Sequence, residues 1–208
     1  MASALDTCVQ YVIDDVRRPD RIDEIKRYIV RNLDRLHRID YFMKDLVEGI
    51  HVFPAGAQAI QQIDLQQDYP KFRRVAFIRQ WYPNNYNPAL LSTGNPETGD
   101  FEEINPSRPA DGYGFDKARV WYHSGASISL RSSSAFDKVV FGYFKTPVLL
   151  PIENMEYDWI LANYTNLVAT AVKVRMFKNI GKDQESADAR EEMKDLMVTF
   201  LGEQALVK

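Results

Sequence analysis

The stretch that decides the fold is DRIDEIKRYIVRNLDRLHRIDYFMKDLVE, residues 20–48. Its apolar residues recur every three or four positions, which places them on one face of a helix. They are Ile22, Ile25, Ile29, Leu33, Leu36, Met43, Leu46 and Val47. The spacing predicts one helix from about residue 20 to residue 48, stopped by Gly49. Because such a helix is long for a globular protein, we expect a break near residues 39–41.

Three further segments show the same helical spacing. Residues 5–16 precede the first stretch, and residues 155–180 and 183–201 lie near the other end of the chain. Gly181 is a natural stop for one of these helices, and Gly202 is a natural stop for the last. The sequence therefore predicts helices at both ends of the chain.

The centre of the chain changes to short runs rich in β-branched and aromatic residues, which favour strands. These runs are residues 72–81, 120–130 and 139–144, and the second contains a glycine turn typical of a hairpin. Three such runs in sequence predict an antiparallel meander. The expected fold class is α+β, mainly helical, with the N- and C-terminal helices packed together and a central antiparallel strand-rich insertion.

Length and composition fit one domain, or one core with an inserted subdomain. The chain has 208 residues, of which 45% are hydrophobic and 26% are charged, and these values are close to those of globular proteins. Within a single domain, residues 1–49 and 152–202 should form the helical part and residues 50–151 the strand-rich insertion. Residues 203–208 are expected to form a C-terminal tail.

A long irregular stretch, residues 82–116, lies between the first strand and the hairpin. A loop of this length is either functional or disordered. Its tyrosines are candidates for an interface, where tyrosine is enriched, and they are Tyr82, Tyr86 and Tyr113. Its acids form a solvated, charge-repelling loop or, as an alternative, supply carboxylates for glycoside hydrolysis. The carboxylates placed for hydrolysis are Glu102, Glu103 and Asp111, and the loop also carries Glu97 and Asp100.

The sequence offers few residues for chemistry. The net charge of −3 argues against nucleic-acid binding by the whole surface. The single cysteine, Cys8, allows no internal disulfide or Cys-based zinc site, and its apolar helical position predicts a buried thiol. Each of the three histidines is isolated in sequence, so surface or packing roles are expected. Because no catalytic or nucleotide-binding motif occurs, we expect no catalytic residue, no cofactor and no metal.

One basic feature has a defined geometry. Arg27, Arg31, Arg35 and Arg38 are spaced by four, four and three residues, which places them on one helix face. They either pair within the helix, with Asp23 four residues before Arg27 and Asp34 four before Arg38, or contact an acidic partner or a DNA phosphate. Both interpretations stay open at the level of sequence.

Three stretches carry a resemblance to a known family. They are RYIVRNLDRLHRIDYFMKDLVE at 27–48, VWYHSGASISLRSSSAFDKVVFGYFKTP at 120–147, and the helical pair at 163–201. Together with the order of the parts, they resemble the head-to-tail adaptor proteins of tailed phages, also called connector, neck or tail tubular proteins. The long loop at 82–116 departs from the family pattern.

The resemblance implies a structural virion protein, not an enzyme. Such proteins form a ring, usually of twelve subunits, between the portal protein and a tail or nozzle protein, and double-stranded DNA passes through the lumen without sequence-specific binding. It implies that the isolated chain is a monomer, made in the host cytoplasm and placed in the virion neck, with no membrane contact. The C-terminal residues Leu206 and Val207 become candidate portal contacts. The acids Glu97, Asp100, Glu102 and Glu103 become candidate lumen residues.

Three alternatives stay open at this point. One is another neck or tail-completion protein of the virion. Another is a cell-wall hydrolase that uses carboxylates of the acidic loop. The last is an interaction domain unrelated to phage.

Overall fold

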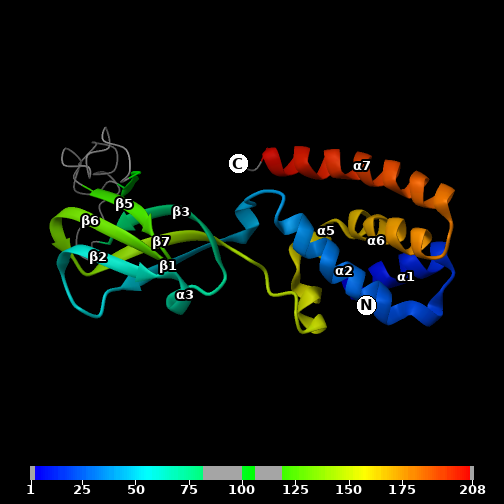
Figure 1. Ribbon diagram of the computed structural model, residues 1–208, viewed down its shortest axis with the longest axis horizontal. Coiled ribbons are helices and arrows are strands. Elements are labelled where there is room, and N and C mark those ends of the chain that lie inside the picture. Colours follow the sequence, from blue (N-terminus) through cyan, green and yellow to red (C-terminus); the bar gives the residue numbers. More distant parts are fainter. Residues whose placement is uncertain (1–2, 82–99, 106–118, 207–208) are drawn as a thin grey trace. The chain divides into compact units, whose positions relative to one another are not determined.

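A computed structural model describes residues 3–81, 100–105 and 119–206, and it divides the chain into two compact units (Figure 1). The helical unit contains Met1–Asp45 and Pro147–Lys208, and the β unit contains Leu46–Thr146. The α+β, mainly helical fold class is confirmed. The strand-rich insertion expected at residues 50–151 corresponds closely to the β unit, which lies between the two helical segments in sequence.

The helical unit packs around one central helix. This helix, α6 (Thr165–Asn179), has buried residues on nearly all sides, because α1 (Ala4–Val16), α2 (Ile22–His37) and α7 (Asp183–Ala205) all pack against it. A short helix, α5 (Trp159–Asn163), precedes α6. The predicted packing of the N-terminal helices against the C-terminal helices is therefore confirmed.

The helix expected at 20–48 ends close to the break expected near residues 39–41, and its second half is wrong because no α-helix follows the break. A 3₁₀ turn at Pro19–Arg21 leads into α2, which ends at His37, and a second 3₁₀ turn at Met43–Asp45 leads into a strand. From Ile25 to Leu36 the stripe is buried as predicted, but Ile22 is 40% exposed and Met43 is 46% exposed. Beyond the end of α2, the Asp45 side chain contacts His37 at 2.9 Å.

Two other helix boundaries also differ from the prediction. The helix expected at 155–180 is divided, because Asp158 accepts hydrogen bonds from the backbone of Ile160 and Leu161 and so caps the start of α5. At the other end, Gly202 does not stop α7, which continues through Ala205. Residues 203–205 of the expected C-terminal tail are therefore helical.

The β unit consists of two sheets. One has the order β1-β7-β3, and the other has the order β2-β6-β5-β4. The strands are β1 (Leu46–Val52), β2 (Gln58–Asp64), β3 (Phe72–Gln80), β4 (Glu102–Glu103), β5 (Arg119–Ser124), β6 (Ser127–Phe136) and β7 (Lys138–Lys145). A four-residue helix, α3 (Leu65–Asp68), follows β2. Most pairs are antiparallel, but β4 runs parallel to β5.

The β5–β6 hairpin is confirmed, and Gly125 occupies its turn with a positive φ of 62°. The single meander is wrong. Only Asp137 separates β6 from β7, yet the two strands belong to different sheets, and β7 pairs with β1 and β3. Inward-facing residues of both sheets form one apolar core, and this burial favours the switch.

Gly142 of β7 lies under the ring of Phe77 in β3, and a Cβ at this position would overlap that ring. We therefore expect Gly142→Val to lower the free energy of unfolding by about 1–3 kcal/mol in urea denaturation. Gly49 of β1 is the matched control, because its Cβ position is open and Gly49→Val should change stability by less than about 0.5 kcal/mol. Adding Phe77→Ala should recover part of the loss. A Gly142→Val chain as stable as the wild type would contradict this packing.

Candidate functional site

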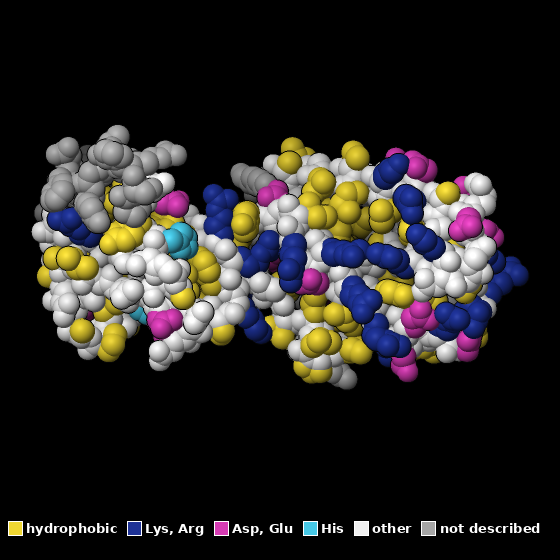
Figure 2. All heavy atoms as spheres, in the orientation of Figure 1, with side chains coloured by type: hydrophobic (Ala, Val, Ile, Leu, Met, Phe, Trp, Pro, Cys, Tyr) yellow, Lys and Arg dark blue, Asp and Glu magenta, His cyan; other side chains and the backbone are white. Residues whose placement is uncertain are grey.

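The predicted row of arginines lies on the solvent side of α2. Arg27, Arg31, Arg35 and Arg38 are all exposed, while Ile25, Ile29, Leu33 and Leu36 on the opposite side are buried. Figure 2 shows Lys and Arg side chains gathered over the face of the helical unit that carries α2. The amphipathic spacing of the sequence thus places a basic surface where a partner can reach it.

The four arginines differ in their contacts. Arg38 forms an ion pair with Asp34 at 3.0 Å, as the intrahelical interpretation predicted. Arg27 instead donates its Nε hydrogen to the backbone carbonyl of Asp23, at 3.3 Å, and Arg31 lies 5.9 Å from the ring centre of Tyr28. Within the part of the chain that the structure describes, Arg27, Arg31 and Arg35 form no ion pair. Intrahelical pairing therefore explains Arg38 alone.

A second charged face lies on α7, and the sequence reasoning missed it. This helix carries seven acids and two bases. Its buried stripe contains Ser186, Ala189, Phe200 and Gln204. The acids Asp188, Glu191 and Asp195 recur at helical spacing on the opposite, exposed side. The spacing of these acids in the sequence could have predicted this acidic face.

The helical unit also contains a buried charged cluster. His37 is 1% exposed, and its two ring nitrogens contact two buried carboxylates, Asp45 through Nδ1 at 2.9 Å and Asp158 through Nε2 at 2.7 Å. Asp45 also accepts a hydrogen bond from the indole Nε1 of Trp159, at 2.8 Å. The cluster joins three places in the chain. His37 ends α2, Asp45 is the last residue before the β unit, and Asp158 caps the start of α5. Sequence reasoning treated His37 as isolated, because its partners lie eight and 121 residues away.

The contacts favour the charged form of His37. Burial by itself lowers the pKa of the imidazole, but the hydrogen bonds and negative charges of Asp158 and Asp45 outweigh it and raise the pKa to about 9. Both ring nitrogens then donate at neutral pH. All three side chains are buried and contact one another, so the cluster suits a structural link better than proton transfer to a substrate.

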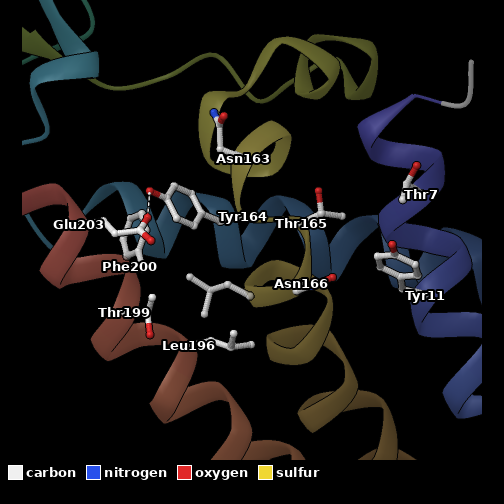
Figure 3. Close-up of a pocket in the computed structure, with 11 residues that line it drawn as sticks. Thr7, Tyr11, Asn163, Tyr164, Thr165, Asn166, Leu196, Thr199, Phe200 and Glu203 are labelled. Carbon is white, nitrogen blue, oxygen red and sulfur yellow. Dashed lines mark hydrogen bonds between the residues drawn. The ribbon is translucent and has the colours of Figure 1, made fainter.

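A groove opens between α1, α7 and the start of α6 (Figure 3). Its volume is about 420 Å³, and its walls mix polar and aromatic residues such as Tyr11 and Phe200. At one end the Tyr164 hydroxyl donates to the Glu203 carboxylate at 2.7 Å and accepts from Gln204 at 2.8 Å. Burial and the bond to Glu203 raise the pKa of Tyr164. These contacts hold α7 to the start of α6.

The remaining predicted site residues are scattered. In the β unit, Asp100 contacts Arg79 at 2.7 Å, and Glu102 and Glu103 are exposed on β4. Leu206, at the end of α7, is 89% exposed. Part of the expected loop is built into the fold, because Phe101 and Ile104 are buried. Tyr82, Tyr86, Glu97, Asp111, Tyr113 and Val207 lie outside the described residues.

Other features bear on chemistry. Cys8 is fully buried, as expected, and burial raises the pKa of its thiol to about 12. In residues 3–81, 100–105 and 119–206, no His, Cys, Asp and Glu side chains are grouped in a way that could hold a metal ion. Among the described helices, none has the length and apolar character needed to span a membrane.

Comparisons with known proteins give no family. No protein-family model matches the chain, and no curated protein matches it.

Proposed function

We propose that this chain is a structural protein of a tailed-phage virion, the head-to-tail adaptor that forms a ring between the portal and the tail. The proposal rests on the sequence resemblance together with the geometry of the molecule. In this role the chain performs no catalysis. It binds the portal protein, a tail or nozzle protein and further copies of itself, and double-stranded DNA passes through the ring.

The observation that supports the proposal best is the construction of the helical unit. Both ends of the chain form it, and a complete β unit is inserted between residues 45 and 147. Such a chain offers two separate bodies for contacts with different neighbours, as a protein between a portal and a tail requires. The exposed charged faces of α2 and α7 add surfaces suited to protein contacts.

The acids of the β unit suit a DNA channel. Glu102 and Glu103 are exposed on β4, and Asp100 is exposed beside them although Arg79 pairs with it. Negative side chains in a lumen repel phosphates and let DNA slide, whereas lysines and arginines hold it. The exposed Leu206 at the end of α7 suits an apolar contact with the portal.

A genetic test follows from the adaptor role. In a phage whose copy of this gene carries an early stop codon, we expect DNA-filled heads without tails, because the portal then lacks the surface on which the tail docks. Electron microscopy of the lysate measures this directly. Supplying the intact chain from a plasmid should restore tailed particles. Tailed, infectious particles without the chain would contradict the proposal.

A further inference from the structure

The positive charge of α2 is available for an intermolecular contact. Three exposed arginines, Arg27, Arg31 and Arg35, form what we call the α2 row. In the described parts of the chain no carboxylate pairs with any of the three. Arg35 is exposed, whereas the neighbouring Leu33 and Leu36 are buried. An exposed guanidinium suits a planar carboxylate partner, which it binds through two donors at once.

The negative charge of α7 provides matching carboxylates. Asp188, Glu191 and Asp195, the α7 row, are exposed. Glu191 contacts Lys194 at 2.7 Å, a surface ion pair of small energy, and Asp188 accepts a hydrogen bond from the neutral Gln184 at 2.9 Å. Most of the charge of this row therefore stays uncompensated within the helix.

The two rows do not meet within one chain. Both helices pack on α6, and each turns its charged row away from its buried stripe. None of the ion pairs formed by the described residues joins the α2 row to α7. The positive and negative faces of one helical unit are thus both left for neighbouring molecules.

The two rows also match in spacing. The arginines recur every four residues, and the acids recur after three and then four. Either spacing is close to one helical turn, about 5.4 Å along the axis. When two such helices lie side by side, each arginine can face one acid along the whole row. Two rows of the same charge at this spacing would instead repel each other along their whole length.

We infer that the α2 row of one copy binds the α7 row of a second copy of this chain. The occupant is a second copy because the same molecule carries both complementary faces, while its net charge of −3 disfavours a nucleic-acid partner. Two different surfaces in contact make a head-to-tail interface, which closes into a ring or continues as a filament. This contact would join neighbouring subunits of the proposed adaptor. Only the closure of the contacts into a ring rests on the proposed function.

A charge swap tests the contact without the portal. One variant carries Arg27→Glu, Arg31→Glu and Arg35→Glu, and a second carries Asp188→Lys, Glu191→Lys and Asp195→Lys. Sedimentation velocity of the full chain at low ionic strength and high protein concentration measures self-association. Circular dichroism verifies that both variants are folded.

A chain that is monomeric in isolation at ordinary salt and concentration should still associate weakly when it is concentrated at low ionic strength. Under those conditions we expect the wild-type chain to form faster-sedimenting species that disappear when salt is added, because exposed charges are screened. In each variant alone, the association constant should fall at least tenfold. An equimolar mixture of the two variants should regain association, because a basic face again meets an acidic one. Lys182→Glu, outside both rows, is the matched control and should associate like the wild type.

Three results would overturn the inference. They are a wild-type chain that stays monomeric throughout, variants that associate like the wild type, and a mixture that fails to regain association. Loss of portal or DNA binding in the first variant with unchanged self-association would assign the α2 row to that other partner. Because the portal is absent from the main experiment, failure here is separate from failure of the adaptor role.

Discussion

Replacing His37 with leucine is expected to lower the free energy of unfolding of the helical unit by about 3–5 kcal/mol. The imidazole is buried between Asp45 and Asp158, which it contacts at 2.9 and 2.7 Å. Leucine removes the positive charge and both donors, and two carboxylates remain buried without it. Burying an uncompensated charge is among the most costly changes in a protein interior.

Urea denaturation followed by tryptophan fluorescence measures this loss, because Trp159 belongs to the same cluster. His123→Leu, on an exposed position of β5, is the matched control and should change stability by about 0.5 kcal/mol or less. Adding Asp45→Asn to His37→Leu should recover part of the loss by removing one buried charge. A His37→Leu chain as stable as wild type would mean that the cluster contributes nothing.

The same cluster sets a pH dependence. The pKa of His37 is raised to about 9 in the folded chain, against an unfolded value of about 6.5. Its contribution is therefore fully present below pH ~6.5 and is lost as the pH rises through about 9, for a total of about 3 kcal/mol. The stability difference between wild type and His37→Leu should shrink accordingly from pH 6 to pH 10. An unchanged difference across that range would show that His37 is not charged in the folded state.

Replacing Phe200 with alanine is the second large change. The Phe200 side chain is fully buried, and its ring centre lies 4.8 Å from that of Tyr164 and 5.3 Å from that of Phe42. It attaches the second half of α7 to the bundle. Truncating such a phenylalanine removes its burial and leaves a cavity, so we expect a loss of about 3–5 kcal/mol.

Urea denaturation and hydrogen exchange measure this effect together. Exchange of the amides in α7 should accelerate more than exchange in α1, because the lost contacts fasten α7. Val198→Ala is the matched control, since Val198 lies two residues away and is 73% exposed. Equal acceleration of amide exchange in α7 and α1 would contradict this role of Phe200. So would a loss of unfolding free energy no greater than that of Val198→Ala.

The sequence predicted features that depend on local periodicity. The buried stripe Ile25, Ile29, Leu33 and Leu36 follows from the 3.6-residue period, and the exposed position of the α2 arginines follows with it. The β5–β6 hairpin was found from its strands and from Gly125 in the turn. Local spacing carries this information, so no distant contact was needed.

The features that sequence missed depend on distant contacts. The apolar spacing of α2 continues at Leu46 and Val47, yet a strand begins there. Helical and strand spacing cannot be told apart in such a short apolar run. The His37 cluster forms only after folding brings Asp158 to the end of α2. The assignment of β6 and β7 to different sheets depends on burial in a shared core, which one sequence does not display.

We propose that this chain forms a ring on a portal. The most direct test mixes the purified chain with portal rings from the same genome and images the product by electron microscopy, with chain and portal alone as controls. We predict a second ring stacked on the portal, with a repeated subunit that contains a helical unit and a β unit. Portal rings that remain bare in the presence of folded chain would contradict the claim.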